Sequence, residues 1–188
     1  MKKSNIGLIC VIAVIVIIAI MMISGYNGMV SKKENVESAL SDLDVMLQRR
    51  ADLIPNLVNT VKGYTSHENE IVNKVIEART KLVNASSIEE KSNANDELTN
   101  SLNSLMVVAE NYPDLKASQN FIQLSDELAG TENRIAVARK DYNNAAKIFN
   151  TTIKKFPNNL LVSIFGFDQV EYFKADESSA EVPNVSFE

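Results

Sequence analysis

The sequence has very few of the side chains on which catalytic and metal sites most often depend. Its only histidine is His67, its only cysteine is Cys10, and it contains no tryptophan. One histidine excludes a metal site with two histidine ligands, and the paired Glu-x-x-His motifs of carboxylate di-iron bundles are absent as well. We therefore expect no enzyme activity, no metal and no cofactor.

Glycine and proline are also scarce, and the net charge is negative. Six glycines and four prolines are scattered through 188 residues. A phosphate-binding glycine-rich loop is therefore absent, and a turn-rich β fold is disfavoured. The net charge is −5 without a basic stripe, which argues against a nucleic-acid partner. With its one cysteine the chain forms no internal disulfide and needs no oxidising compartment.

A long uncharged stretch lies near the start of the chain. It begins at Ile6 and runs without charge to Ile23, and residues 24–30 extend it. At about 1.5 Å rise per residue, residues 6–23 approach the ~30 Å hydrocarbon thickness of a bilayer. The pattern predicts a short N-terminal tail at 1–5, then a transmembrane helix with an interfacial flank at 6–30. The lipid bilayer is the first partner that the sequence implies.

The alternative for this stretch is a cleaved signal peptide. The apolar core of a signal peptide is usually about 7–15 residues long and is followed by small residues at the cleavage site. Here the run is longer, and bulky Met22 and Ile23 stand where small residues are required. We predict an uncleaved single-pass anchor in the cell membrane. Two lysines at each end of the run leave its orientation undecided by the positive-inside rule.

Beyond the uncharged stretch, apolar residues recur at helical spacing in four segments. The longest series are Val36, Leu40, Leu43, Leu47, Ile54, Leu57 and Val61, and Phe121, Leu128, Ile135, Tyr142 and Phe149. Shorter series pass through Val72, Val75 and Leu82, and through Leu98, Leu102 and Leu105. Such seams face other helices at a shallow crossing angle, as in coiled coils and bundles. The sequence predicts an all-α chain, with the transmembrane helix followed by an antiparallel up-and-down four-helix bundle.

Turn and cap residues separate these four segments. The boundary signals are Gly63, a capping box from Ser87 to Glu90, Pro113, and Pro157 after a last helix expected from Ala117 to Phe156. Pro55 falls inside the first segment and should kink that helix rather than end it. We expect the bundle over residues 31–174. Residues 175–188 lack a core of their own and are expected to form a flexible tail.

Three blocks of the sequence closely resemble a known family. They are residues 42–68 (DLDVMLQRRADLIPNLVNTVKGYTSHE), 110–121 (ENYPDLKASQNF) and 132–150 (ENRIAVARKDYNNAAKIFN). Together with FGF at 165–167, YFKAD at 172–176 and VPNVSF at 182–187, they are similar to the LemA family over nearly the whole chain. The resemblance implies a single-pass bacterial membrane protein with a helical bundle and no established reaction. It also slightly favours a cytoplasmic location for the bundle.

Charged residues interrupt the apolar seams or lie beside them: Arg50, Glu68, Arg79, Glu132 and Arg139. Because a buried charge without a partner costs several kcal/mol, we expect these residues to pair. Our preferred interpretation is an internal ion-pair network that fixes helix register. The alternative is a polar site that binds a ligand or partner, which would require a pocket opening onto these charges.

An aromatic group follows the last long helical segment. Its members are Phe165, Phe167, Tyr172 and Phe173. We expect them to dock on the bundle, and the alternatives are contact with the membrane surface or with a partner protein.

These features predict an interaction or scaffolding module at the bacterial cell membrane. Its partners would be unidentified membrane or membrane-proximal proteins, which include further copies of this chain. The alternative function is a ligand-binding sensor or an enzyme that uses the seam charges.

Overall fold

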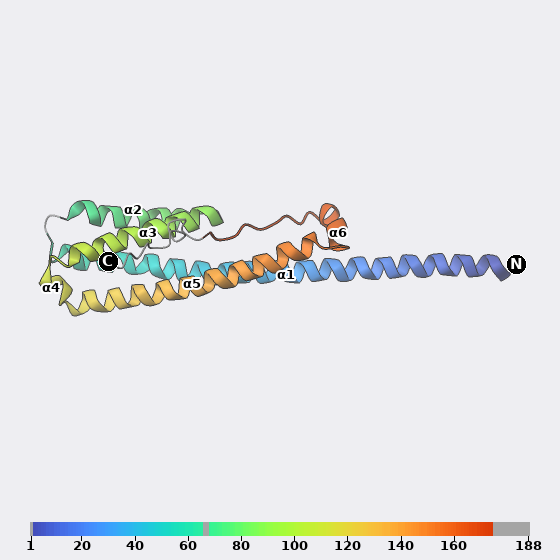
Figure 1. Cartoon of the computed structure of the whole chain (residues 1–188), viewed down its shortest axis with the longest axis horizontal. Coiled ribbons are helices and arrows are strands. Elements are labelled where there is room, and N and C mark those ends of the chain that lie inside the picture. The colour runs from blue at the N-terminus through green and yellow to red at the C-terminus, as the bar shows by residue number, and fades with distance from the viewer. Residues whose placement is uncertain (1, 66–67, 175–188) are drawn as a thin grey trace, which may run out of the picture. The chain divides into compact units, whose positions relative to one another are not determined.

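A computed structural model describes residues 2–65 and 68–174 of the chain. These residues form no strand, and their helices are α1 (Lys2–Lys62), α2 (Asn69–Asn84), α3 (Ile88–Ala109), α4 (Pro113–Lys116), α5 (Gln119–Lys154) and α6 (Asn158–Phe165) (Figure 1). The all-α prediction is confirmed. His67 and the predicted tail at 175–188 lie outside the described residues.

The first helix combines an uncharged segment with a segment that carries charged side chains and a periodic apolar seam. α1 is continuous for 61 residues and includes both the uncharged stretch and the first seam of the bundle. It continues through Pro55, as the unbroken apolar pattern predicted. Among the described helices, α1 is the one long and apolar enough to cross a membrane. The transition near residue 31 is therefore a change of side chains and not of backbone.

The chain divides into two compact units, and α1 and α5 each contribute to both. One unit contains residues 1–39 and 143–170, and we call it the anchor unit. The other contains, among the described residues, 40–65, 68–142 and 171–174, and we call it the bundle unit.

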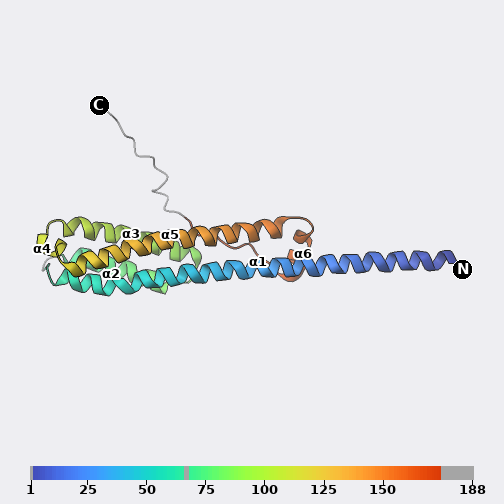
Figure 2. The same cartoon turned by 90° about the horizontal axis from the view of Figure 1, so that it is seen from below.

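The bundle unit consists of α2, α3 and the adjoining parts of α1 and α5. Each of these four helices reverses the direction of the one before it, as Figures 1 and 2 show. The predicted seams form its core, in which the most deeply buried side chains include Leu43, Ile54, Leu57, Val75, Leu98, Leu105, Ile135 and Tyr142. The predicted four-helix bundle is confirmed. The four-residue α4, which starts at Pro113 and buries Leu115, was not predicted.

A capping box opens α3, as the sequence predicted. The Ser87 hydroxyl accepts a hydrogen bond from the N–H of Glu90 at 3.1 Å, and the Glu90 carboxylate accepts one from the N–H of Ser87 at 3.1 Å. Ser86 donates its N–H and its hydroxyl to the same carboxylate. These donors, chiefly the N–H groups of Ser86 and Ser87, lower the pKa of Glu90 because they stabilise its ionised form.

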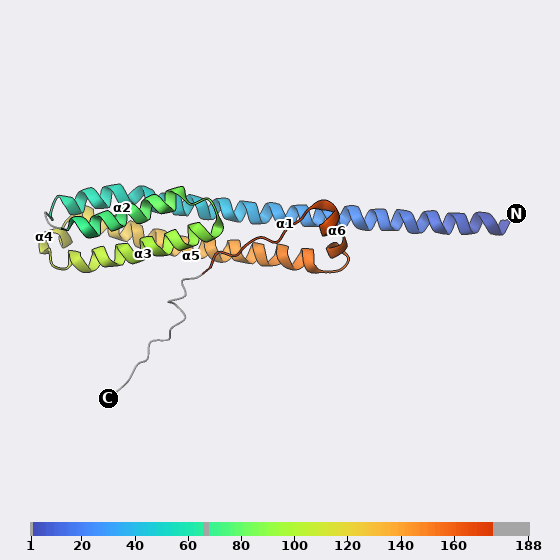
Figure 3. The same cartoon turned by 90° about the horizontal axis from the view of Figure 1, so that it is seen from above.

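The anchor unit contains a helix that the sequence analysis missed. α6 follows Pro157 and ends at Gly166, whose φ of 68° is the left-handed conformation that glycine adopts without strain. The N–H groups of Gly166 and Phe167 both donate to the carbonyl of Val162. In Figure 3, α6 lies against α1. Its eight residues fell below the length at which periodicity identifies a helix.

Candidate functional site

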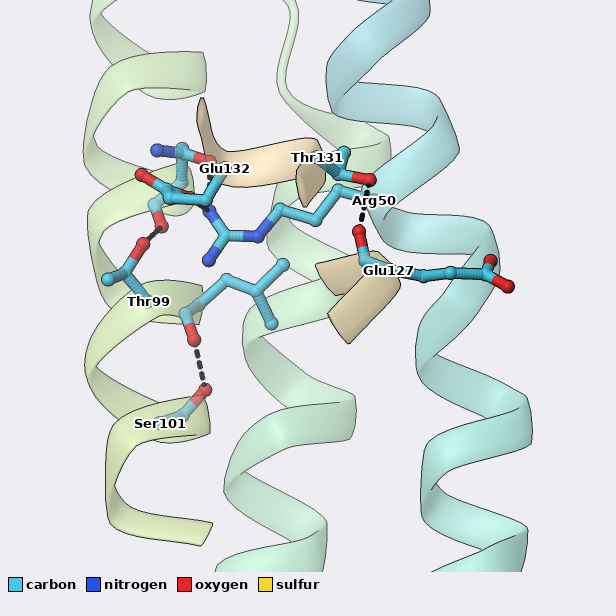
Figure 4. A network of polar contacts seen from close by, with 8 residues as sticks. Arg50, Thr99, Ser101, Glu127, Thr131 and Glu132 are labelled. Atoms are coloured by element: carbon cyan, nitrogen blue, oxygen red, sulfur yellow. Dashed lines mark hydrogen bonds and ion pairs between the residues drawn. The ribbon is translucent and has the colours of Figure 1, made fainter. Parts of the chain in front are cut away.

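Arg50 is the most deeply buried charge in the bundle unit. It extends from α1 with only 4% of its side chain exposed, and its Nη1 lies 2.6 Å from Oε2 of Glu132 on α5. The same nitrogen donates a hydrogen bond of 2.6 Å to Oδ1 of Asn95 on α3. Figure 4 shows the guanidinium of Arg50 lying beside Glu132. One cation thus connects three helices of the bundle.

The charge of Arg50 is compensated, but not completely. Burial lowers the pKa of Arg50, and the negative charges of Glu132 and Asp96 oppose that shift. Although Oε2 of Glu132 is close enough for an ion pair, the contact lacks hydrogen-bond alignment. Nε of Arg50 is buried without a hydrogen-bond partner among the described residues. The Glu132 side chain nevertheless reaches solvent, because 42% of the whole side chain is exposed.

Hydroxyl groups near Arg50 donate hydrogen bonds to backbone carbonyls of their own helices. Thr131 donates to the carbonyl of Glu127 at 2.8 Å, Thr99 to that of Asn95 at 3.0 Å, and Ser101 to that of Leu98 at 2.9 Å (Figure 4). Because each hydroxyl is engaged with a carbonyl of its own helix, the surroundings of Arg50 resemble a packed core more than a ligand site.

The other predicted charges are distributed over separate contacts. Glu68 accepts a hydrogen bond of 2.9 Å from the hydroxyl of Tyr112, which raises the pKa of Tyr112. Nε of Arg79 donates to the carbonyl of Ala51 at 3.0 Å. Arg139 is half-buried and makes no hydrogen bond or ion pair with the part of the chain that the structure describes. Of the five residues, the structure brings only Arg50 and Glu132 into contact.

Sequence reasoning missed two polar residues that connect α3 to α1, Asn95 and Lys91. Asn95 has an exposed fraction of 1% and lies three residues before Leu98, so it continues the seam of α3. Its position in that apolar series was the signal that could have identified it. Lys91, whose Nζ lies 2.7 Å from Asp44, connects α3 to α1 and carried no comparable signal.

The aromatic group is divided between the two units. In the anchor unit, the rings of Phe165 and Phe167 lie 4.7 and 5.9 Å from that of Tyr26, measured between centroids. In the bundle unit, Phe173 is buried and Tyr172 is exposed. Phe167 and Phe173 are thus buried, each in its own unit, whereas Phe165 and Tyr172 are exposed.

Hydrogen bonds to side chains hold the backbone that follows α6. Asn150 donates to the carbonyl of Val170 at 2.8 Å and accepts from its N–H at 2.9 Å. In the bundle unit, the hydroxyl of Tyr142 donates to the carbonyl of Glu171 at 2.6 Å. Burial, and secondarily the charge of Glu171, raises the pKa of Tyr142. This extended segment is thus fastened by side chains instead of by a strand partner.

Two hollows on the described part of the bundle unit have linings that do not include Arg50, Glu68 or Arg139. One of about 220 Å³ is lined by residues of α1 and α2 with Lys91. Another, of about 570 Å³, lies along α1 and α5 and is lined by Arg49, Asp126, Arg134 and neighbouring residues. Within the described ranges, no group of three or more histidine, cysteine or carboxylate residues is placed to hold a metal ion.

Comparison with known proteins shows relatives that match most of this chain and a smaller share of their own length. The LemA family profile matches residues 39–187. Protein LemA of Metamycoplasma hominis is 30% identical over 80% of this chain and 69% of its own length. Magnetosome protein MamQ 2 of Paramagnetospirillum magneticum is 29% identical over 95% of this chain and 74% of its own. Magnetosome protein MamQ of Magnetospirillum gryphiswaldense is 27% identical over 99% of this chain and 78% of its own length.

The profile match includes Arg50, Asn95 and Glu132 and the parts of α1, α2, α3 and α5 that form the bundle unit. Since it also covers most of the chain, this membrane-associated helical protein belongs to the LemA family.

Proposed function

We propose that this protein is an uncleaved single-pass membrane protein whose bundle unit is an interaction or scaffolding module at the bacterial cell membrane. The observation that carries the proposal is the packing of α6 against the end of the uncharged stretch of α1. A Cβ added at Gly25 would lie 3.1 Å from Leu161 and 2.9 Å from Asn158.

This packing supports retention of the uncharged stretch in the mature protein. A signal peptide leaves the chain on cleavage and therefore has no permanent partner in the folded protein. Here Ile18, Met21 and Met22 share a hollow with residues of α6, and Met29 is fully buried. Cleavage after residue 24 would remove part of the surface against which α6 packs.

The environment of Arg50 supports a scaffold over a sensor or an enzyme. A soluble ligand would have to reach a guanidinium of which 4% is exposed. Arg50 already contacts Glu132 and Asn95, so its charge is used within the bundle. The names of the MamQ relatives identify a cellular structure and no reaction, which is compatible with an organising function. Partners would then bind the outer surface of the bundle unit, for which we propose a cytoplasmic location.

Proximity labelling from the full-length chain tests this function. A labelling enzyme is fused to the C-terminus, and a matched fusion that lacks residues 40–174 provides the background. We expect a reproducible set of membrane proteins to be labelled above this background. A photo-crosslinker at Val107, whose side chain is exposed on α3, should capture members of the same set. Labelling no greater than that of the matched fusion would contradict the scaffolding function.

A further inference from the structure

The corner between α5 and α6 exposes an unusual amount of apolar surface. Phe156 is 79% exposed, Leu160 59% and Ile164 66%. The segment from Phe156 to Phe167 (FPNNLLVSIFGF) contains no charged residue. An exposed contiguous apolar surface of this kind marks a contact with a partner or a membrane.

The opposite face of α6 fixes its position along α1. Leu161 is buried, and its side chain approaches Gly25 so closely that a Cβ there would be 3.1 Å away. The ring of Phe165 contacts that of Tyr26 at a centroid distance of 4.7 Å. α6 therefore lies beside the last turns of the uncharged stretch, as Figures 2 and 3 also show.

An apolar hollow of about 350 Å³ lies at this contact. It is lined by residues of α1, by residues of α6 and by the two residues that precede α6, among them Ile18, Met21, Met22, Phe156, Leu160 and Ile164. None of the residues that line it is charged. Water has few hydrogen-bond partners in such a space, whereas hydrocarbon can fill it without losing any hydrogen bond.

The position along α1 gives the depth of this hollow in a bilayer. Lys32 is the first charged residue after the uncharged stretch. At ~1.5 Å per residue, Met22 lies about 15 Å along the helix axis from Lys32. The headgroup region of each leaflet is about 5–7 Å thick. With Lys32 at the bilayer surface, the hollow and the exposed face of α6 are at the level of the acyl chains.

The backbone of α6 is suited to that environment because N–H groups at both of its ends donate to nearby carbonyls. Gly166 and Phe167 cap the C-terminal end through Val162, and at the start the N–H groups of Asn159 and Leu160 donate to the carbonyls of Lys155 and Pro157. Lipid provides no hydrogen bonds, so only segments with such internal pairing are stable within it. The preceding lysines, Lys154 and Lys155, have flexible stems that reach toward headgroups.

We propose that α6 is a second lipid-embedded element, whose exposed face, formed by Phe156, Leu160 and Ile164, contacts the acyl chains of the leaflet that the end of α1 crosses. The corner between α5 and α6 is thus inserted in the membrane without spanning it. This inference rests on the proposed membrane anchor, and its test is designed to distinguish the two.

The experiment places one fluorescent probe at a time on the full-length protein in phosphatidylcholine vesicles. The native Cys10 reports on the uncharged stretch of α1. A Cys10→Ala, Ile164→Cys variant reports on α6. A Cys10→Ala, Val107→Cys variant is the matched control, because Val107 is 69% exposed and Ile164 66% exposed. Each protein is measured with ordinary lipid and with lipid brominated along its acyl chains, which quenches probes in the hydrocarbon.

We expect brominated lipid to quench the probe at Ile164→Cys to a similar extent as the probe at Cys10, and to leave that at Val107→Cys unchanged. Quenching at Cys10 with none at Ile164→Cys would overturn the insertion of α6 and leave the anchor intact. Absence of quenching at both would refute the anchor, and the insertion with it. Disulfide formation between two Ile164→Cys chains without quenching would assign the surface to a second copy of the chain, which also overturns the proposal.

Discussion

The anchor unit and the bundle unit differ in their exposed apolar side chains, which cover the uncharged stretch of α1 and part of α6 in the anchor unit and are fewer in the bundle unit. In the bundle unit, residues such as Leu43 and Leu98 are buried, whereas in the anchor unit residues such as Leu8 and Ile164 are exposed. Both units consist of ordinary α-helices, and α1 contributes to each. The difference teaches that the surrounding solvent, and not the backbone, decides which face of a helix carries apolar side chains. A polar exterior suits water, and an apolar exterior suits lipid.

Replacing a leucine by alanine should change the free energy of unfolding very differently in the two units, and this is the largest difference that we expect. Leu43→Ala removes a fully buried side chain and should lower the free energy of unfolding by about 2–5 kcal/mol. Leu8→Ala removes an exposed side chain and should leave unfolding of the bundle unit unchanged. Thermal melts of both variants in the same detergent provide the comparison. Equal losses, or a loss below about 0.5 kcal/mol for Leu43→Ala, would show that the core is assigned wrongly.

Replacing one partner of the buried ion pair should cost more stability than replacing the other. Glu132→Leu leaves Arg50, with 4% of its side chain exposed, without its anion. Because the Glu132 side chain itself reaches solvent, we expect a loss of about 2–3 kcal/mol, below the ~3–5 kcal/mol of fully buried pairs. Arg50→Met should cost less, since the remaining Glu132 can be hydrated. Denaturant melts give both values.

The double variant Arg50→Met, Glu132→Leu should recover much of the loss, because it leaves no unpaired charge. Arg139→Met is the matched control, and since Arg139 has no partner among the described residues it should change stability by no more than about 0.5 kcal/mol. A stabilising effect of Arg50→Met would overturn the structural interpretation, because functional charges are often held at a cost to stability.

Loss of the α3 cap should have a smaller effect. Ser87→Ala removes the acceptor of the Glu90 N–H and should destabilise the bundle unit by about 1 kcal/mol. Ser101→Ala, which also removes a hydroxyl from α3 but lies away from its end, serves as the control in the same thermal melts. A loss at Ser101→Ala as large as at Ser87→Ala would contradict the role of the cap.

The carboxylate of the capping box should make a pH-dependent contribution. The pKa of Glu90 is lowered in the folded protein, so its stabilising effect is present above its unfolded pKa of about 4.3 and is lost as the pH falls through the lower folded value. Glu90→Ala should therefore be less stable than the parent at pH 7 and equal to it at strongly acidic pH. If the stability difference between Glu90→Ala and the parent stays constant from pH 7 to acidic pH, the ionised carboxylate is excluded as its cause.

The sequence predicted the core more fully than the polar contacts. Periodic residues such as Leu43 and Ile135 identify a buried face because burial requires a repeating helical pattern. Contacts such as Arg50 with Asn95 depend on which residues of two helices reach the same level, and one sequence does not determine this. Arg79 shows the same limit, since its partner is a backbone carbonyl. α6 was missed because its eight residues are too few for a clear period.

The most direct test of the account is the N-terminal sequence and intact mass of the mature protein in fractionated cells, with carbonate and high-salt extraction. We predict a chain that retains the stretch from Ile6 to Ile23, remains with the membranes after both extractions, and contains residue 24 joined to residue 25. A mature chain that begins after residue 24 and is released into the soluble fraction would contradict the retained anchor, and with it the opposite environments assigned to the two units.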